Sequence, residues 1–209
     1  MDATTNHRGW AERSGEYSPT YYAHLGPNKV SRSLVTVLDS FHDGEELSIL
    51  EIGCSSGRHL AHLLEHGYEH LHGIDINDTS FSVMAEYFPE LAESGTFHTG
   101  AIEEVVPAFP DDAFDVVYSV ETLQHVHEDN VWVFDELARI TGHLLVTVEN
   151  EGNGDDHDRE DDDVRLVNDE FPIYFRDWER IFTNAGLVSK LEETGTLDTI
   201  RVFQKPPGE

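Results

Sequence analysis

Residues 49–60 constrain the fold of this chain more than any other stretch. A short apolar run between Ile49 and Ile52 is long enough for a buried strand and too short for a buried helix. Small residues follow between Gly53 and Gly57, and leucines at helical spacing come next. The order of strand, glycine-rich turn and helix is typical of the start of a nucleotide-binding α/β domain.

The spacing of the small residues distinguishes between kinds of ligand. A dinucleotide-binding fingerprint, Gly-x-Gly-x-x-Gly, has its third glycine five positions after the first. Here Gly53, Ser55 and Gly57 follow each other at steps of two, Arg58 occupies the fifth step, and Glu51 stands two positions before the first glycine. This spacing argues against a nicotinamide-dependent oxidoreductase.

These residues resemble motif I of the class I S-adenosylmethionine-dependent methyltransferases, Glu/Asp-x-Gly-x-Gly-x-Gly, with Ser55 in place of the middle glycine. The resemblance implies an α/β fold with a doubly wound, seven-stranded, mostly parallel sheet and an antiparallel last hairpin. It also implies S-adenosylmethionine as the cofactor. We expect an N-terminal extension with a cap helix at residues 1–45 and the cofactor-binding methyltransferase domain at residues 46–205. The alternative is an ordinary strand-to-helix turn without a ligand.

The second and third strand ends extend the expected cofactor site. Asp75 ends an expected strand at residues 70–75, 18 positions beyond Gly57, where a carboxylate can accept protons from both ribose hydroxyls. It could instead cap the following helix. Residues 100–105 resemble the adenine-contacting turn of the family, with Ala101 where many members have an acid. The expected cofactor-binding residues are Glu51, Gly53, Cys54, Ser55, Gly57, Asp75, Ile76, Ala101, Ile102 and Ser119.

The end of the fourth expected strand, residues 114–120, should face the reaction, because ligands of open α/β sheets bind beyond the carboxyl ends of the strands. His125 matches the family's Leu-x-His position and is the candidate catalytic base, since an imidazole titrates near the working pH. It could instead only hydrogen-bond the backbone and shape the pocket. The expected acceptor pocket comprises Tyr21, Tyr22, Glu121 and His127.

Other patterns complete the expected fold. Residues 1–19 read as irregular, and the nine acids between Glu149 and Asp163 read as a solvated loop, because their spacing does not match a calcium-binding EF-hand loop. The remaining periodicities predict helices at residues 30–41, 80–88, 130–140 and 176–185, and strands at 96–99, 143–148, 187–192 and 199–204.

The charge of the chain is unusual. Its 209 residues include 42 Asp and Glu against 13 Lys and Arg, a formal net charge of −29, and the acids are spread over the whole length. Such a surface repels itself in dilute buffer and is tolerated near molar salt, where the Debye length falls to roughly 3 Å. We therefore expect a protein from a salt-accumulating halophile, namely a halophilic archaeon. An acidic face for one basic partner is the alternative, but it would cluster the charge.

Composition also limits the partners and the compartment. The single cysteine, Cys54, excludes an internal disulfide, and no signal-peptide core or bilayer-spanning apolar run is found, so a cytoplasmic protein is expected. Basic residues are few and unclustered, which argues against a nucleic-acid acceptor. His59, His62 and His66 share a helix face but lack further ligands at metal-binding spacing, so no metal is expected. The sequence thus favours a methyltransferase acting on an unidentified small molecule; a non-catalytic protein of the same fold is the alternative.

Overall fold

The computed structural model describes residues 2–41, 46–152, 164–167 and 171–207. Its main sheet has seven strands in the order β3-β2-β1-β4-β5-β9-β8, and those up to β5 are parallel. The strands are β1 (Ser48–Ile52), β2 (His70–Asp75), β3 (Thr96–Thr99), β4 (Phe114–Val120), β5 (Thr141–Asn150), β8 (Val188–Thr194) and β9 (Asp198–Gln204). β9 runs antiparallel to β5 and pairs with β8 in the closing hairpin. The predicted fold class is confirmed.

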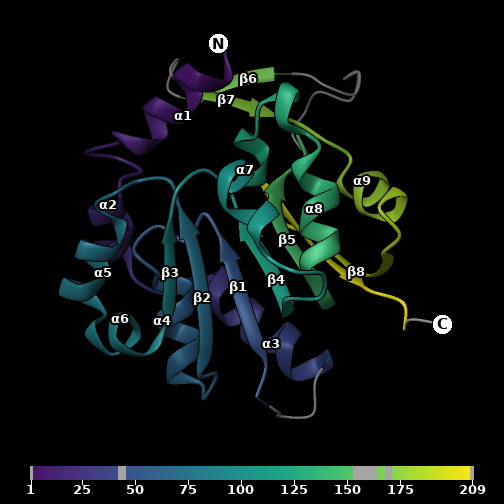
Figure 1. Ribbon diagram of the computed structural model, residues 1–209, viewed down its shortest axis with the longest axis horizontal. Helices are drawn as coiled ribbons and strands as arrows, with labels where there is room; N and C mark the ends of the chain where they lie inside the picture. Colours follow the sequence, from purple (N-terminus) through teal and green to yellow (C-terminus); the bar gives the residue numbers. More distant parts are fainter. Residues whose placement is uncertain (1, 42–45, 153–163, 168–170, 208–209) are drawn as a thin grey trace.

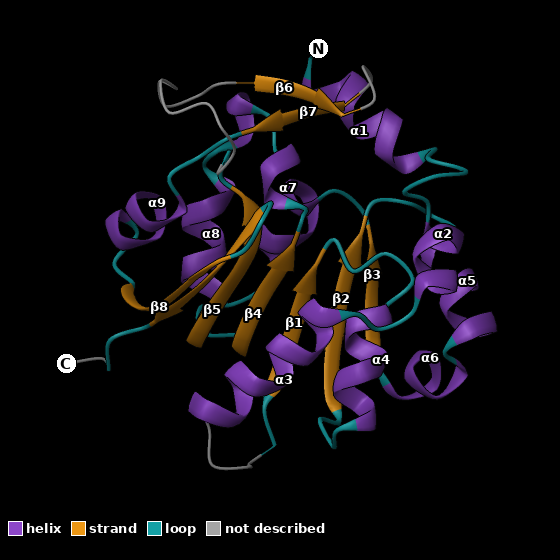
Figure 2. Cartoon of the chain, turned by 180° about the vertical axis from the view of Figure 1, so that it is seen from behind, coloured by secondary structure: helices purple, strands orange, loops and turns teal. Residues whose placement is uncertain are grey.

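Helices cover both faces of this sheet (Figures 1 and 2). On one face lie α3 (Lys29–Phe41), α4 (Arg58–Glu65), α5 (Ser80–Tyr87) and α6 (Pro89–Ser94), which share a core with Ile49 of β1 and with Leu47 just before that strand. The other face is covered by α7 (Ile102–Val105), α8 (Val133–Ile140) and α9 (Trp178–Asn184) around the buried Trp178 and Phe182. Because both faces are covered, the central strands are apolar almost throughout.

The N-terminal segment contains two helices where the sequence was expected to be irregular. In α1 (Ala3–Ala11), the Asp2 carboxylate caps the first turn by accepting from the Thr5 N–H. Ser18 caps α2 (Pro19–Leu25) in the same way. The apolar pattern of α1 was too short to predict this helix from the sequence. Trp10 of α1 packs against Phe171, with 4.3 Å between the ring centroids. The expectation for residues 1–19 was therefore wrong.

A small second layer lies over the carboxyl ends of the parallel strands, at the top of Figure 1. It consists of α1 and the antiparallel pair β6 (Val164–Val167) and β7 (Phe171–Tyr174). Single 3-10 turns at Val106–Ala108, Leu123–His125 and Glu128–Asn130 connect the main elements below it. The layer of α1, β6 and β7 forms the roof of the functional site.

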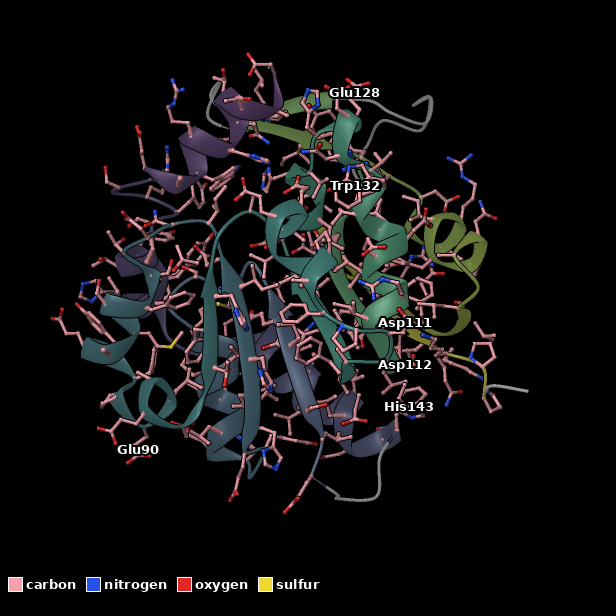
Figure 3. The ribbon with its side chains drawn as sticks, in the orientation of Figure 1. Glu90, Asp111, Asp112, Glu128, Trp132 and His143 are labelled. Carbon is pink, nitrogen blue, oxygen red and sulfur yellow. The ribbon has the colours of Figure 1, made fainter. Side chains whose placement is uncertain are left out.

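One part of the acidic stretch is not a solvated loop. Glu149 is the ninth residue of β5 and is 0% exposed, so its assignment to the loop was wrong. Residues 153–163, with the other aspartates of that prediction, lie outside the described residues. Figure 3 shows labelled carboxylates far apart over the molecule, with Glu90 on α6, Asp111 before β4 and Glu128 near the roof. This scatter fits a distributed charge and not a single acidic face.

In the described part of the chain, no helix combines the length and the apolar character needed to cross a membrane.

Candidate active site

A cavity of about 350 Å³ opens at the carboxyl ends of β1, β2 and β4, beneath the roof. Its volume lies in the range of small-molecule sites. Three groups of residues line it: the turn after β1, the ends of β2 and β3, and the segment after β4. Trp10 and Tyr17 from the N-terminal segment close it from above, and Asp198 at the start of β9 closes one side. The topology therefore gathers residues far apart in sequence around one space.

The turn after β1 approaches the rest of the site closely. Gly53 has φ +70°, and a Cβ there would overlap the Thr122 side chain. Ser55, at the middle position of the motif, also adopts a positive φ of 50°, which strains a non-glycine residue. Gly57 serves another purpose, because a Cβ there would come within 2.7 Å of Met84 and Leu91 in α5 and α6. Gly57 thus permits helix packing and does not line the cavity.

Asp75 ties the turn after β1 to the end of β2. Its Oδ2 accepts from the Ser55 N–H at 2.8 Å, and its Oδ1 accepts from the Asn77 N–H at 2.9 Å and from the Ser80 hydroxyl at 2.8 Å. Burial raises the pKa of this carboxyl group, and the hydrogen bonds oppose that change. Asp75 therefore combines the two roles considered for it: it bonds the backbone of the segment leading into α5, and it lines the cavity.

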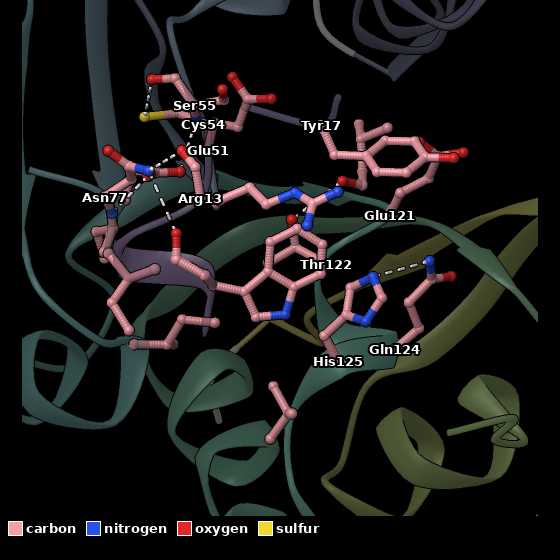
Figure 4. A pocket seen from close by; sticks show the side chains of 18 of the residues that line it. Arg13, Tyr17, Glu51, Cys54, Ser55, Asn77, Glu121, Thr122, Gln124 and His125 are labelled. Atoms are coloured by element: carbon pink, nitrogen blue, oxygen red, sulfur yellow. Dashed lines mark hydrogen bonds between the residues drawn. The ribbon is translucent and has the colours of Figure 1, made fainter. Parts of the chain in front are cut away.

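Glu51 brings a buried carboxyl group to the cavity wall. It is 1% exposed and lines the cavity, and burial raises its pKa to about 8, which the neighbouring Tyr118 hydroxyl and, to a smaller extent, Arg58 oppose. Within the described ranges its Oε2 has no hydrogen-bond partner, nor does the Ser55 hydroxyl beside it. Buried polar atoms are usually paired, so these two lack partners that a bound ligand can supply. Figure 4 shows Glu51, Cys54 and Ser55 gathered on one side of the cavity.

The turn after β3 forms a second, more apolar wall. Ala101 and Ile102 line it, as does Ile76 from the segment after β2. Glu103 lines it too. Its Oε1 accepts from the Asn130 side-chain amide at 2.8 Å and lies 3.2 Å from His7 Nε2 in α1. The roof is thereby joined to this wall.

His125 lines the opposite side of the cavity, near Gln124 in Figure 4. Its Nδ1 lies 2.8 Å from the Pro172 carbonyl oxygen, and because a carbonyl can only accept, Nδ1 bears the proton. The ring packs against Trp10 at 4.6 Å. Burial lowers the pKa of His125 to about 4. Burial thus works against the expected titration of this imidazole near the working pH, and its role as catalytic base stays a prediction.

The sequence did not reveal what holds the turn that contains His125. The buried carboxylate of Glu149 accepts from the Ser119 hydroxyl at 2.6 Å and from the N–H groups of Thr122, Leu123 and Gln124. Burial raises the pKa of Glu149 to about 7, against these bonds. Ser119 thus bonds Glu149 and does not line the cavity. The position of Glu149 at the end of a strand could have indicated a role near the site. The run of acids that follows Glu149 in the sequence obscured this signal.

A buried cation holds the other side of the same turn. The Arg176 guanidinium donates to the Leu123 carbonyl oxygen at 3.1 Å and to the Val126 carbonyl oxygen at 2.6 Å. The backbone from Thr122 to Val126 therefore has an anion at its N–H groups and a cation at its carbonyl groups. We call Glu149 and Arg176 the turn clamp.

The four residues expected in the acceptor pocket are only partly brought together. Tyr22 and Glu121 line the cavity, whereas Tyr21 does not and packs edge-on between Tyr17 and Tyr22. His127 also lies off the cavity, because its Nδ1 accepts from the Asp129 N–H at 3.2 Å as a cap of the next turn. Neither side chain reaches the cavity wall, since neighbouring side chains in a turn point in different directions, and the acceptor-pocket role of both residues stays a prediction.

Tyr17 and Asp198 take part instead. Tyr17 lies beside Glu121 in Figure 4, and Asp198 reaches the cavity from the closing hairpin. Burial and the neighbouring Glu121 carboxylate raise the pKa of Asp198 to about 7. Neither residue had a recognisable pattern in the sequence.

Among the described residues, no group of three or more His, Cys, Asp or Glu side chains could hold a metal ion. His59 hydrogen-bonds the Ser31 hydroxyl at 2.8 Å, and burial lowers its pKa to about 3, as for a core histidine. Cys54 lines the cavity, but burial raises the pKa of its thiol well above the ordinary value, which leaves it a poor nucleophile.

Comparison with known proteins gives these features a context. Residues 49–143 match the family model described as a methyltransferase domain. The tRNA U34 carboxymethyltransferase of Shewanella halifaxensis is 33% identical over 49% of this chain and 31% of its own length. The ubiquinone biosynthesis O-methyltransferase of Rickettsia felis is 24% identical over 65% of this chain and 51% of its own length. The chain thus spans about half or less of the curated relatives it matches.

Solved structures resemble it over a greater length. Magnesium protoporphyrin IX methyltransferase from Synechocystis PCC 6803, with bound S-adenosylhomocysteine, matches with a TM-score of 0.69 at 14% identity, covering 98% of this chain and all of that one. A methyltransferase from Aquifex aeolicus matches with a TM-score of 0.64 at 18% identity, covering 90% and 99%. Residues 49–143 therefore match a methyltransferase domain, and the chain has the fold of the class I S-adenosylmethionine-dependent methyltransferases.

Proposed function

We propose that this protein binds S-adenosylmethionine in the cavity and transfers its methyl group to a small-molecule acceptor. The observation that supports this most is the convergence of the motif I turn, Asp75 and the turn after β3 on one cavity, where Glu51 Oε2 and the Ser55 hydroxyl lack partners. An enzyme needs such convergent polar groups to fix the orientation of a ligand.

The lining residues fit the parts of this cofactor. Glu51 is suited to its ammonium group, Asp75 to the ribose hydroxyls, and Ile76, Ala101 and Ile102 to the adenine ring. Gly53 and Cys54 keep the turn close to the ligand, while Gly57 and Ser119 support the site from behind. When bound, the cofactor supplies an electrophilic methyl group on a sulfonium.

On the acceptor side, the chain's own groups position the methyl acceptor and exclude water. The turn clamp fixes Gln124 and His125, and Trp10 covers the His125 ring from the roof. With Nδ1 protonated, Nε2 is the accepting nitrogen of the His125 ring, and it lies 3.4 Å from the Gln124 side-chain amide nitrogen, which an acceptor's hydrogen would replace. The low pKa of His125 makes it a weak base. We infer that orientation of the acceptor supplies most of the rate enhancement and that proton transfer supplies less.

The acceptor is proposed to be a small molecule. The names of the relatives point to different roles, which are modification of tRNA U34, ubiquinone biosynthesis and methylation of phosphoethanolamine. A net charge of −29 with 13 basic residues disfavours nucleic acid, whose binding depends on neutralising phosphates. We further propose that the protein works in the salt-rich cytoplasm of a halophile, because its acids are distributed over the surface.

Calorimetry at high salt tests the cofactor. We expect S-adenosylmethionine and S-adenosylhomocysteine to bind and NAD not to bind. Binding of NAD without binding of S-adenosylmethionine would contradict the proposal. A second step, a methyl-transfer screen over small-molecule acceptors in multimolar KCl, separates an enzyme from a non-catalytic cofactor-binding protein of this fold, which would bind but not transfer.

A further inference from the structure

Two carboxyl groups that the fit of the cofactor does not use meet at the mouth of the cavity. Glu121 follows β4 and is exposed, Asp198 begins β9 and is half-buried, and both line the cavity. Burial, the charge of Glu121 and a hydrogen bond between the two side chains raise the pKa of Asp198 to about 7. No cationic side chain of the described residues forms an ion pair with either group at 4.0 Å or less. The cavity mouth therefore carries negative charge that these residues do not neutralise.

Aromatic rings stand next to this charge. Tyr17 lies beside Glu121 in Figure 4, and burial together with the charge of Glu121 raises the pKa of the Tyr22 phenol. Arg13 also lines the cavity, but its guanidinium carbon lies over ring faces, 5.7 Å from the Tyr17 centroid and 5.0 Å from that of Phe171. Because the rings exclude water, a cationic ligand would interact more strongly with these carboxylates than with carboxylates on an open surface.

A neutral acceptor on the roof points to the same kind of ligand. Asn6 of α1 is 1% exposed and lines the cavity, and its Nδ2 donates to the His125 carbonyl oxygen at 2.8 Å. Its Oδ1 has no hydrogen-bond partner among the described residues. A buried acceptor is usually paired, so a ligand that brings N–H donors would supply what Asn6 lacks. Trp10 Nε1 on the same helix is an unpaired donor and can bond a second, neutral group of that ligand.

An apolar side chain lies next to the two carboxyl groups. Leu197, the residue before Asp198, lines the cavity although it is 65% exposed. It therefore offers apolar contact beside the negative charge, which suits a ligand with a charged end and an apolar body. A bound metal ion fits less well, because the described residues provide no third His, Cys, Asp or Glu ligand here.

We propose that Glu121 and Asp198 bind a protonated amine of the methyl acceptor, and that Leu197 contacts the apolar part next to this amine. The inference rests on the proposed function and names the class of acceptor, a small amphipathic amine. A protonated amine has no lone pair, so while it keeps its proton it anchors the acceptor and does not itself attack the sulfonium methyl group.

Calorimetry with two matched ligands tests this subsite. Benzylamine and benzyl alcohol, which differ in the charged group, are titrated into the protein with saturating S-adenosylhomocysteine, in the same salt and at about pH 8, where Asp198 is largely ionised. The wild type should prefer benzylamine by about tenfold or more. Glu121→Gln and Asp198→Asn should each reduce this preference, and the double variant should remove it without weakening benzyl alcohol.

Two further variants separate charge from apolar contact. Glu90→Gln, at an exposed carboxylate of α6, removes one formal charge elsewhere and should keep the preference for benzylamine. Leu197→Ala should weaken both ligands by the same factor, because the two share the apolar ring.

Equal binding of benzylamine and benzyl alcohol by the wild type would overturn the inference, as would a preference that survives in the double variant. It is also overturned if the double variant keeps the preference but weakens S-adenosylhomocysteine, because the carboxyl pair would then hold the ammonium group of the cofactor. Wild-type protein that does not bind S-adenosylhomocysteine contradicts the proposed function instead, and the two ligands titrated into the free protein still test Glu121 and Asp198.

Discussion

Replacing Glu51 by glutamine should make the protein more stable at alkaline pH while weakening its cofactor binding. The carboxyl group is 1% exposed, and burial raises its pKa from 4.5 to about 8. The folded state therefore holds a proton that the unfolded chain releases above pH 4.5. By linkage, the stability due to this proton is complete below pH 4.5 and is lost as the pH rises to 8. Glutamine keeps the shape without titrating.

The magnitude follows from the size of this pKa change. Each unit of difference between the folded and unfolded pKa corresponds to about 1.4 kcal/mol. Between pH 5 and pH 8 the free energy of unfolding of the wild type should fall relative to Glu51→Gln by about 3–4 kcal/mol. The same substitution removes the proposed partner of the cofactor's ammonium group, so S-adenosylmethionine should bind more weakly by about 1–3 kcal/mol.

Urea denaturation of both proteins from pH 5 to pH 9, at fixed KCl concentration, measures the first effect, and calorimetry measures the second. Glu104→Gln, at an exposed carboxylate of α7, controls for the loss of one formal charge. Parallel stability curves for the wild type and Glu51→Gln would refute the reasoning, because they would mean that Glu51 is ionised in the folded state and that the Tyr118 hydroxyl and Arg58 outweigh its burial.

Three further outcomes follow from the same site. Binding of S-adenosylmethionine near pH 7 should release a proton from Glu51, which calorimetry in buffers of different ionisation enthalpy detects; buffer-independent heats would contradict this. Asp75→Ala should weaken cofactor binding by about 1–3 kcal/mol because it also removes the acceptor of the Ser55 N–H, and unchanged affinity would show that Asp75 is only structural. His125→Gln should leave cofactor binding intact and, once an acceptor is known, reduce kcat by less than the roughly 10²–10⁴-fold typical of a general base; a larger loss would show that His125 is the base despite its low pKa.

The melting temperature should also rise with KCl concentration, because a net charge of −29 destabilises the folded state at low ionic strength. A melting temperature that does not change from dilute buffer to several molar KCl would show that the acids do not act as a repulsive surface.

The sequence predicted the sheet well because its strands are short apolar runs between clear breaks. The ranges expected for the second, third and fourth strands agree with β2, β3 and β4. A parallel strand that is buried on both faces is apolar along its whole length, so it can be predicted from a short stretch of sequence without knowledge of distant residues. The helix expected at residues 80–88 agrees with α5, but the sequence analysis did not predict α6, which begins at Pro89, a position that suits proline because its missing N–H would be unpaired there.

The site was predicted only where the signal was local. Glu51 and Asp75 stand at strand ends next to a recognisable turn, and both line the cavity. The low pKa of His125 could not be predicted, because it results from burial under Trp10 and β7, which are distant in sequence. Arg58 and Tyr22 likewise meet only after α2 folds against the start of α4.

The turn clamp has a consequence for the proposed adaptation of this protein to salt. Ions screen charges that face water, but they reach buried charges far less. Glu149 is 0% exposed and Arg176 is 8% exposed, so concentrated KCl should weaken the surface ion pairs while leaving this pair of charged groups nearly untouched. The segment next to the acceptor would then keep its shape over a range of ionic strengths in which the outer surface changes its electrostatics completely. Geometry at the proposed reaction centre would thereby be insulated from changes in the salt concentration of the surrounding solvent.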